Sequence, residues 1–238
     1  MTVHPDTTTD DLKTKNLPAN HVVPDYNPFY AVMQAIIRVV STVYFRLQTF
    51  GAENTPPTGP VVLVCNHASH IDPTTIACNL PRQTYFLAKE DLFVGLLGKF
   101  LRKVNSHPIN RSGVDKAALK LCVDIVRQGH MLMVFPEGQR TEDGSLQEGK
   151  PGSAMIALMA NAQILPAYID GSLDVMPKGA KFPRPRKVRV FVGKSFPSSE
   201  GIDTSLPKRE QYAALTTKIM TRLAELQQQA RTFKSNLR

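Results

Sequence analysis

The sequence predicts an α/β fold with a mixed, mainly parallel sheet that is covered by helices and preceded by an amphipathic helix. Short apolar runs alternate along the chain with segments whose apolar residues recur at helical spacing. The first such run, Val61–Cys65, is apolar at every position, which is typical of a strand buried on both faces. The length of 238 residues suits one domain with short attachments. Together these observations favour a single sheet with helices packed against it.

The N-terminal part divides into a tail and a helix. Residues 1–25 have neither the basic start nor the apolar run of a secretory signal, and they are expected to form a flexible tail. Residues 26–50 are expected to hold an amphipathic membrane-associating helix. Its apolar part, Phe29–Phe45, is shorter than the roughly 20 residues that span a bilayer and carries Arg38 at its middle. The helix is therefore expected to lie in the membrane interface, although periodicity alone equally allows packing on the domain.

The main domain is expected at residues 51–206, after a turn rich in proline and glycine. A final helix over 208–232, within a C-terminal segment 207–238, carries an apolar face and is expected to pack back on the domain. The expected strands are 61–65, 84–88, 108–110, 131–135, 164–169 and 187–192, and the expected helices begin near 73 and cover 92–103, 114–127 and 152–162.

The charge and cysteine content narrow the class of partner. Lys and Arg exceed Asp and Glu by 29 to 20, a formal charge of +9 that favours anionic partners. Seven basic residues and no acid lie between positions 178 and 194, and acidic headgroups or an anionic acyl donor explain them better than nucleic acid, because no nucleic-acid recognition signature is present. A solvated basic loop remains the plain alternative. Three cysteines without metal-ligand spacing indicate a reducing cytosolic setting and no metal site.

The residues that carry chemistry begin directly after the first predicted strand, in the run Asn-His-Ala-Ser-His-Ile-Asp-Pro at 66–73. Reactive groups gather at strand ends in open α/β sheets. His67 could remove a proton from a hydroxyl group, while Asp72 on the other ring nitrogen would fix the tautomer and stabilise the imidazolium. A cysteine hydrolase built on Cys65 is disfavoured because Cys65 belongs to the apolar run, and no G-x-S-x-G nucleophile elbow occurs.

This run resembles the N-H-x-x-x-x-D signature of the glycerolipid acyltransferases, specifically the lysophosphatidic acid acyltransferase group. Further blocks in the order of that family make the resemblance specific, and together they cover roughly residues 51 to 196. These blocks are a lysine-bearing segment at Leu87–Phe93, a segment ending in arginine at Pro108–Arg111, the run Phe135–Thr141 followed by Asp143 and Gly144, and Ile164–Tyr168.

The resemblance implies the fold of that family and a role for each matching residue. His67 would act as the base that deprotonates the acceptor hydroxyl, and Asp72 would orient it. Arg111 and Arg140 would bind the acceptor phosphate, because a guanidinium matches phosphate geometry, and Lys89 would add a point charge. Transfer would then be direct, without an acyl-enzyme.

The roles of two further residues, and the acceptor itself, are less closely defined. Glu137 would hold one of the cations or bind the acceptor's glycerol, and Gly138 would let the turn bring backbone amides close to substrate. The chain departs from the family pattern at Ser106, where glycine is more frequent, and at Asn110, where an acidic residue is more frequent. Acceptor identity is therefore less certain than reaction type.

The implied function is O-acyl transfer from acyl-CoA or acyl-carrier protein to lysophosphatidate, giving phosphatidate, without a cofactor. The implied location is the cytosolic face of an anionic membrane, with the enzyme attached peripherally or monotopically. Acylation of another lysolipid by the same pair is the nearest alternative. A catalytically silent lipid-binding protein is the alternative of another class, and the intact His67 and Asp72 argue against it.

Overall fold

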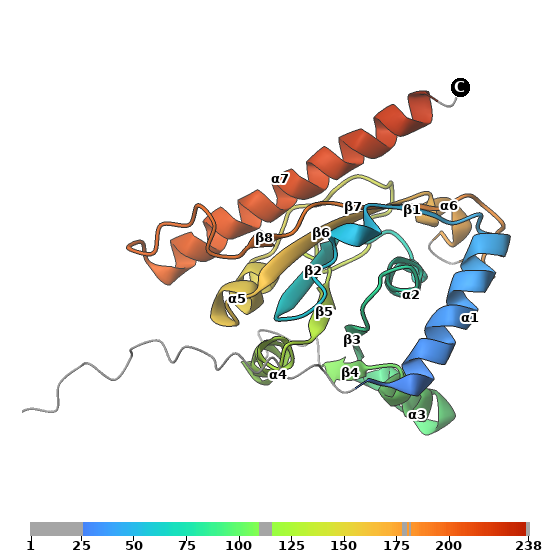
Figure 1. Cartoon of the computed structure of the whole chain (residues 1–238), viewed down its shortest axis with the longest axis horizontal. Coiled ribbons are helices and arrows are strands. Elements are labelled where there is room, and N and C mark those ends of the chain that lie inside the picture. The colour runs from blue at the N-terminus through green and yellow to red at the C-terminus, as the bar shows by residue number, and fades with distance from the viewer. Residues whose placement is uncertain (1–25, 110–115, 178–179, 181, 237–238) are drawn as a thin grey trace, which may run out of the picture.

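The computed structural model describes residues 26–109, 116–177, 180 and 182–236, so the expected tail at 1–25 lies outside the described residues. The described part forms an eight-stranded sheet in the order β1-β7-β6-β2-β5-β3-β4, with β8 also paired to β6 (Figure 1). Neighbouring strands are parallel, except that β7 and β8 run antiparallel to β6. The mixed, mainly parallel sheet expected from the sequence is therefore confirmed. The strands are β1 (Gln48–Phe50), β2 (Val61–Cys65), β3 (Thr84–Lys89), β4 (Ser106–Ile109), β5 (Met131–Val134), β6 (Gln163–Asp170), β7 (Arg189–Val192) and β8 (Phe196–Pro197).

Helices cover both faces of the sheet and form a three-layer arrangement (Figure 1). One face is covered by α1, α2 and α6, and the other by α4, α5 and α7. The helices are α1 (Pro28–Tyr44), α2 (Asp72–Ala77), α3 (Gly95–Lys103), α4 (Lys116–Arg127), α5 (Gly152–Met159), α6 (Ser172–Val175) and α7 (Lys208–Ser235), with 3-10 turns η1 (Ala52–Asn54) and η2 (Glu90–Leu92).

The position of β2 inside the sheet, between β6 and β5, explains why its sequence is apolar throughout. All five of its residues are fully buried. Val61, Leu63 and Cys65 belong to the core on the α2 side, whereas Val62 and Val64 belong to the core on the α4 and α5 side. Because successive side chains point to opposite faces, a strand with helices on both sides needs an apolar residue at every position.

The polar side of helix α1 faces the domain. Gln34 donates hydrogen bonds to the carbonyl oxygens of Ala77 and Leu80, at 2.9 and 3.0 Å. Arg38 Nε donates to the carbonyl oxygen of Cys78 at 2.8 Å. The polar side therefore docks on α2, because it satisfies carbonyl groups at the end of that helix. The exposed apolar side chains of α1 are Phe29, Val32, Ile36, Val39, Val40, Val43 and Tyr44.

The exposed apolar stripe of α1 follows helical spacing. Its two ends contact the domain, because the Phe29 ring meets that of Phe100 and the Tyr44 hydroxyl donates to the carbonyl oxygen of Pro183. None of the described helices is both long enough and apolar enough to cross a membrane. Helix α1 also packs on the domain, the alternative that periodicity allowed, because Tyr30 is buried and Ile37 packs against the core. Its association with a membrane stays a prediction.

The sheet begins before residue 51, where the main domain was expected to start. Gln48–Phe50 form strand β1, which pairs in parallel with β7, and Leu47 just before it is buried. Strand β4 also starts earlier than expected, at Ser106, because its pairing with β3 runs from Phe86–Ser106 to Lys89–Ile109. Short edge strands of this kind depend on a neighbouring strand and leave little local pattern in the sequence.

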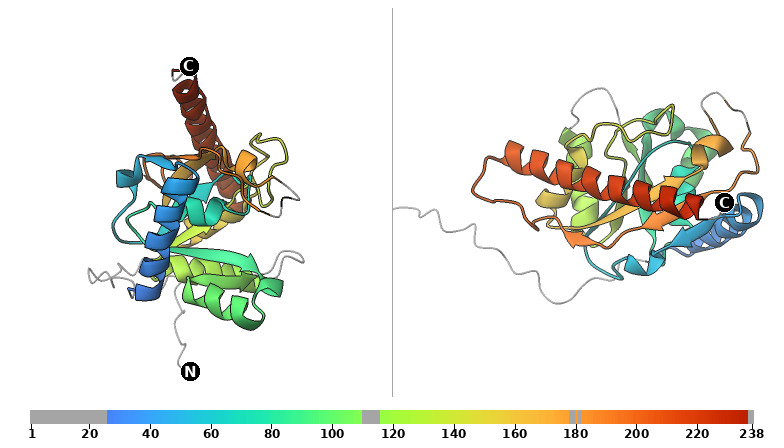
Figure 2. Two further views of the ribbon diagram at one scale, coloured as in Figure 1. Left: turned by 90° about the vertical axis from the view of Figure 1, so that its right-hand side faces the viewer. Right: turned by 90° about the horizontal axis from the view of Figure 1, so that it is seen from above.

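The C-terminal helix α7 lies across β6, β7 and α5 (Figure 2). Leu215, Ile219 and Leu223 on its expected apolar face are fully buried. Its end is held by Asp170, which forms ion pairs with Lys234 at 2.8 Å and with Arg189 at 3.5 Å. Arg189, one of the seven basic residues at 178–194, is therefore a buried structural cation. Lys178 and Lys181 of that run lie outside the described residues.

Candidate active site

The carboxyl ends of parallel strands bring the predicted site residues together. In the register between β2 and β5, Val64 is opposite Val134. His67 and Glu137 each follow that pair by three residues, so the two chains leave the sheet side by side. Lys89 ends β3 on the other side of β5. The site thus occupies the sheet edge where ligands bind in open α/β folds.

His67 and Asp72 form the expected pair. His67 Nδ1 lies 3.0 Å from Asp72 Oδ2, and the imidazole stacks on the ring of Phe135 with centroids 3.9 Å apart. The Asp72 side chain is fully buried, whereas the His67 side chain is 15% exposed. Because Nδ1 faces the carboxylate, Nε2 is the ring nitrogen left to accept a proton from substrate.

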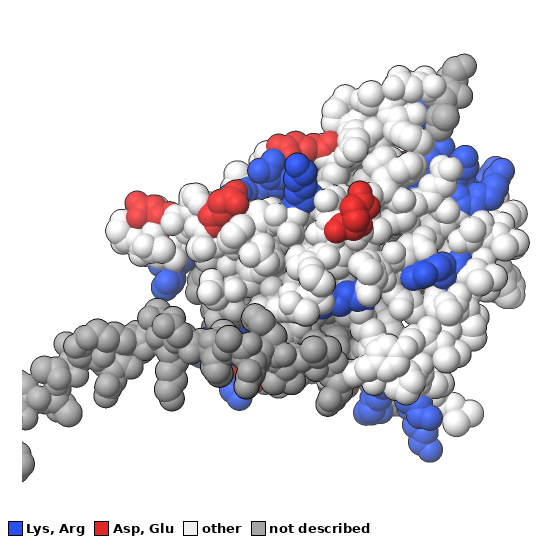
Figure 3. Space-filling model, in the orientation of Figure 1, with Lys and Arg blue, Asp and Glu red and all other residues white. Residues whose placement is uncertain are grey.

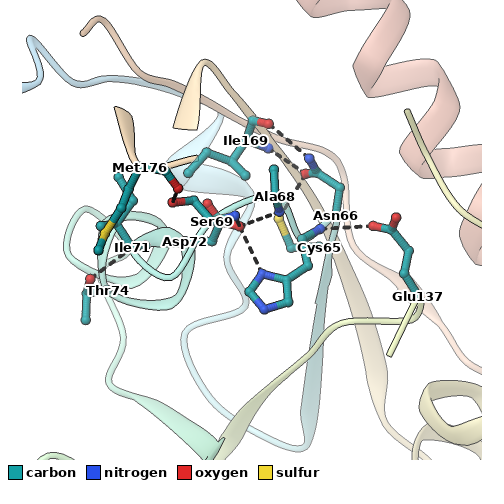
Figure 4. A network of polar contacts seen from close by, with 11 residues as sticks. Cys65, Asn66, Ala68, Ser69, Ile71, Asp72, Thr74, Glu137, Ile169 and Met176 are labelled. Carbon is teal, nitrogen blue, oxygen red and sulfur yellow. Dashed lines mark hydrogen bonds and ion pairs between the residues drawn. The ribbon is translucent and has the colours of Figure 1, made fainter. Parts of the chain in front are cut away.

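Asp72 also shapes the loop that carries the histidine. The same oxygen, Oδ2, accepts hydrogen bonds from the backbone N–H groups of Ala68 and Ser69, both at 2.7 Å (Figure 4). These donors offset the cost of burying a carboxylate. A tight loop of four residues between histidine and aspartate is therefore closed by the aspartate itself, which explains why this spacing suits the chemistry.

Glu137 supports the backbone of His67 and does not face an open ligand site. Its Oε1 accepts a hydrogen bond from the N–H of His67 at 2.9 Å, and its Oε2 accepts one from the N–H of Gln147 at 2.9 Å. The side chain is buried, and burial raises the pKa of the Glu137 carboxyl while the two backbone donors lower it. Both oxygens of Glu137 are bonded to backbone, a supporting contact that the sequence did not indicate, and the expected roles in holding a cation or binding glycerol stay predictions.

Thr141 completes the support of the histidine. Its N–H donates to the carbonyl oxygen of His67 at 2.8 Å. His67 is therefore held at its N–H, its carbonyl, its ring nitrogen and its ring face, and three of these contacts come from residues 135–141. Sequence reasoning missed Phe135 and Thr141 as site residues, although both belong to the block that carries the resemblance.

Asn66 was also missed, and it joins the site to the sheet. Its Oδ1 accepts a hydrogen bond from Ile169 N–H at 2.8 Å, and its Nδ2 donates to Ile169 O at 3.0 Å (Figure 4). The amide thus extends the pairing between β2 and β6 beyond the last residue of β2. Its place as the first residue of the N-H-x-x-x-x-D signature was the signal in the sequence.

A cavity of about 580 Å³ opens beside His67. Lys89, Gln139 and Arg140 line it together with His67, and apolar side chains from α1, α2, β3 and the α3 region form much of the rest of the wall. This combination suits a ligand with an anionic head and an apolar chain. Arg111, the other expected phosphate ligand, and Asn110 lie outside the described residues.

His70 also lines this cavity, although the sequence assigned it no role. Desolvation, followed by the charges of Arg140 and His67, lowers the pKa of His70. Burial is the main cause, and both burial and the nearby Arg140 favour the neutral form of this imidazole.

Gly138 adopts a left-handed backbone conformation, with φ of 69°. A Cβ there would lie 3.1 Å from the Lys150 side chain, so glycine suits both the turn and its neighbour. Its N–H donates to Phe135 O at 3.0 Å, closing the turn after β5. The approach of substrate to this turn remains a prediction.

Cys65 packs inside the sheet, as expected. It is fully buried, and burial raises the pKa of its thiol well above the ordinary value. A thiol held protonated and away from the cavity cannot act as a nucleophile. Among the described residues no group of three His, Cys, Asp or Glu side chains is placed to hold a metal ion.

Comparison with known proteins places this geometry in context. The chain is 28% identical over 194 residues to a 1-acyl-sn-glycerol-3-phosphate acyltransferase of Bacillus subtilis, covering 80% of this chain and 93% of that protein. It is 30% identical over 178 residues to an enzyme of the same name from Chlamydomonas reinhardtii, covering 72% of this chain but only 53% of the longer algal protein. The crystal structure of the Thermotoga maritima 1-acyl-sn-glycerophosphate acyltransferase PlsC superposes with a TM-score of 0.68 and 24% identity, over 83% of this chain and 79% of that chain, which shows a shared fold.

A family model, Acyltransferase, matches residues 46–170. This segment is just over half of the chain and contains the His67–Asp72 pair, the residues that support it and most of the cavity wall. The sequence blocks, the fold and the site geometry therefore lead to one conclusion: the chain belongs to the acyltransferase family.

Proposed function

We propose that the protein transfers a fatty acyl group from an acyl thioester to the free hydroxyl of 1-acyl-glycerol 3-phosphate, giving phosphatidate. The observation that carries this proposal is the His67–Asp72 pair, which lies at the wall of a cavity lined by two cationic side chains and many apolar ones. The similarity to enzymes named for this reaction supports the choice of acceptor.

The chemistry follows from the free ring nitrogen. His67 Nε2 takes the proton of the acceptor hydroxyl as its oxygen attacks the thioester carbonyl. The tetrahedral intermediate then collapses, the C–S bond breaks, and the leaving thiolate takes the proton from His67. Asp72 stabilises the imidazolium between these steps. The donor is acyl-CoA or acyl-carrier protein, and the transfer requires no further cofactor.

The acceptor phosphate would be bound by cations at the histidine end of the cavity. Arg140 and Lys89 line the same cavity as His67. A guanidinium offers forked donors that match phosphate oxygens, and an ammonium adds a mobile point charge. Another lysolipid remains the second candidate acceptor because Asn110 departs from the family pattern. The intact catalytic pair argues against a silent lipid-binding protein.

Association with the cytosolic face of an anionic membrane is part of the same proposal. The exposed apolar stripe of α1 supports it, because such a stripe suits burial at the boundary between headgroups and acyl chains. A substitution tests this better than a deletion of residues 1–50, because β1 belongs to the sheet. Val39→Glu combined with Val43→Glu should weaken sedimentation with anionic vesicles, and unchanged sedimentation would exclude α1 as an anchor.

The reaction is tested with the full-length protein, acyl-CoA or acyl-carrier protein, and a panel of lysolipids. Thiol release and phosphatidate formation should require lysophosphatidate, and His67→Ala should reduce the rate by about 10²–10⁴-fold. His130→Gln is a suitable control, because His130 directly precedes β5 and so lies at the amino end of that strand, away from the carboxyl ends that carry the site. Undiminished transfer by His67→Ala would exclude the mechanism, and transfer only to another lysolipid would exclude the acceptor.

A further inference from the structure

Helix α3 and the turn before it expose an unusual amount of apolar surface. Of the nine residues of α3, only Gly98 is buried. A Cβ at Gly98 would lie 2.3 Å from the carbonyl carbon of Phe93, so the helix packs closely against the turn that precedes it. The α3 patch is defined by the exposed side chains Leu92 (45%), Val94 (67%), Leu96 (84%), Leu97 (51%) and Phe100 (41%).

A helix of this length is not expected to be stable on its own. Isolated helices shorter than about 12 residues are marginal in water, and most helices in proteins are stabilised by packing of their apolar side. In α3, Leu101 is half-buried, but Leu96, Leu97 and Phe100 are exposed. Contiguous exposed apolar side chains of this size typically mark a surface that another phase or molecule covers.

Cations border the α3 patch. Lys99, Arg102 and Lys103 are exposed, and α3 itself contains no acidic residue, although Glu90 and Asp91 precede it in η2. Arg102 lies over the ring of Phe93 at 5.2 Å, and Lys103 lies over the ring of Phe29 at 5.4 Å. Figure 3 shows Lys and Arg side chains at the end of the molecule where α3 lies, next to a largely uncharged surface over α1. An apolar surface edged with cations complements an anionic lipid headgroup layer.

The α3 patch is continuous with α1 and with the cavity. Phe100 meets Phe29 of α1 edge to face, with ring centroids 6.1 Å apart. Figure 2 shows α1 and α3 next to each other on one side of the molecule. Leu92 and Phe100 are exposed and also line the cavity that contains His67. The same side chains therefore form both the outer surface and the cavity wall.

We propose that η2 and α3 form a second membrane-inserting element beside α1, and that lipid chains enter the cavity from the bilayer between these two helices. The proposal rests on the proposed function in that the cavity is taken as the lipid site. The occupant of the α3 patch is the acyl-chain region of an anionic bilayer. A long-chain substrate then reaches His67 without leaving the apolar phase, whereas a water-soluble substrate does not need α3.

The first test replaces Leu96 and Leu97 by Glu in the full-length protein. Neither residue lines the cavity, and Glu suits the first turn of a helix, so the fold should persist. A matched control is Met159→Glu with Leu206→Glu, which alters two exposed apolar residues outside α1 and α3 by the same charge. Vesicles of phosphatidylcholine and phosphatidylglycerol serve as the probe.

The expected result separates membrane contact from catalysis. Leu96→Glu with Leu97→Glu should lower the partition coefficient at least about tenfold and lower turnover of vesicle-embedded lysophosphatidate to a similar extent. Turnover of a short-chain, water-soluble lysophosphatidate should stay within about twofold of wild type. Partitioning equal to that of the control would overturn the proposal. Wild-type protein that partitions but shows no acyl transfer would instead contradict the proposed function alone.

A second measurement does not depend on the charged variant folding. Cys65, Cys78 and Cys122 are buried, so a polarity-sensitive fluorophore can be attached selectively at Leu96→Cys. Its emission should shift to the blue on adding anionic vesicles, more than on adding pure phosphatidylcholine, while the label at Leu206→Cys should not shift. No shift at position 96 would overturn the proposal. A shift caused by raising protein concentration without vesicles would assign the α3 patch to a second copy of the chain and would also overturn it.

Discussion

The carboxylate of Glu137 accepts a hydrogen bond from the backbone N–H of His67 at 2.9 Å, across a separation of 70 residues in sequence. Its other oxygen accepts from the N–H of Gln147 at 2.9 Å. The histidine that we propose as the base is thus fixed by a buried side chain from the neighbouring strand end, and we expect Glu137 to act as a positioning residue.

Glu137→Gln should impair catalysis because it alters the position of His67. A glutamine has one oxygen, so one of the two backbone donors would face its NH₂ group. The loss of a buried hydrogen bond to a charged acceptor costs about 1.5–3 kcal/mol. We expect kcat to fall at least about tenfold with KM changed less than about threefold, measured by steady-state kinetics. Glu148→Gln, at an exposed neighbouring site, is the control. A raised KM with unchanged kcat would instead indicate that Glu137 binds substrate.

Substitutions at Asp72 should separate structure from chemistry. Asn keeps an oxygen that can accept from Ala68 and Ser69, but it loses the charge that stabilises the imidazolium. We expect Asp72→Asn to retain most of the unfolding free energy and to lose about 10²-fold or more in kcat. Asp72→Ala leaves two buried donors unsatisfied, at about 1–3 kcal/mol each, and should unfold at lower urea concentration. Equal stability of the two variants would contradict this account of the loop.

The free energy of unfolding should decrease as the pH falls below neutrality, because folding lowers the pKa of two histidines. Desolvation lowers the pKa of His107 from 6.5, and desolvation together with Arg140 and His67 lowers the pKa of His70. Since folding lowers these pKa values, the unfolded chain binds protons more readily, and their contribution to stability is lost as pH falls from 6.5 through the folded values.

Urea unfolding of wild type and His107→Gln at about pH 7.5 and about pH 5 measures this effect. The variant should lose less stability between the two conditions than wild type, because one of the two groups no longer titrates. The comparison between proteins removes the opposite contribution of Glu137, whose raised pKa causes stability to decrease as pH rises. An equal pH dependence in both proteins would rule out His107 as a contributor.

Two glycines with similar backbone angles should respond differently to alanine. Gly171 has φ of 84° and Gly59 has φ of 81°, so both substitutions incur the strain of a left-handed residue, about 1–2 kcal/mol. A Cβ at Gly171 would lie 2.3 Å from the carbonyl oxygen of Lys187, whereas a Cβ at Gly59 meets nothing within 4 Å. Gly171→Ala should therefore be less stable than Gly59→Ala by about 1–3 kcal/mol. Equal unfolding free energies of the two variants would show that the backbone near Lys187 moves to accommodate the added methyl group at little energetic cost.

Much of the fold could be predicted because its signals are local. The apolar run of β2, the helical period of α7 and the alternation of the two element types follow from side-chain direction within a few residues. The reactive pair was also visible, since His67 and Asp72 lie five positions apart in one loop. Strand β1 could not be predicted from local signals, because three residues are too few to show a period and only the pairing with β7 makes them a strand.

Only the tertiary structure determines the contacts between segments that are distant in the sequence. No local pattern indicates that both oxygens of Glu137 bond to backbone, because the register of β2 with β5 creates that contact. Nor does amphipathicity say which side of α1 faces the domain; the carbonyl groups of Ala77 and Cys78 determine it by binding Gln34 and Arg38. Periodicity separates the two sides of a helix, but only the neighbours that satisfy its polar groups determine which side turns outward.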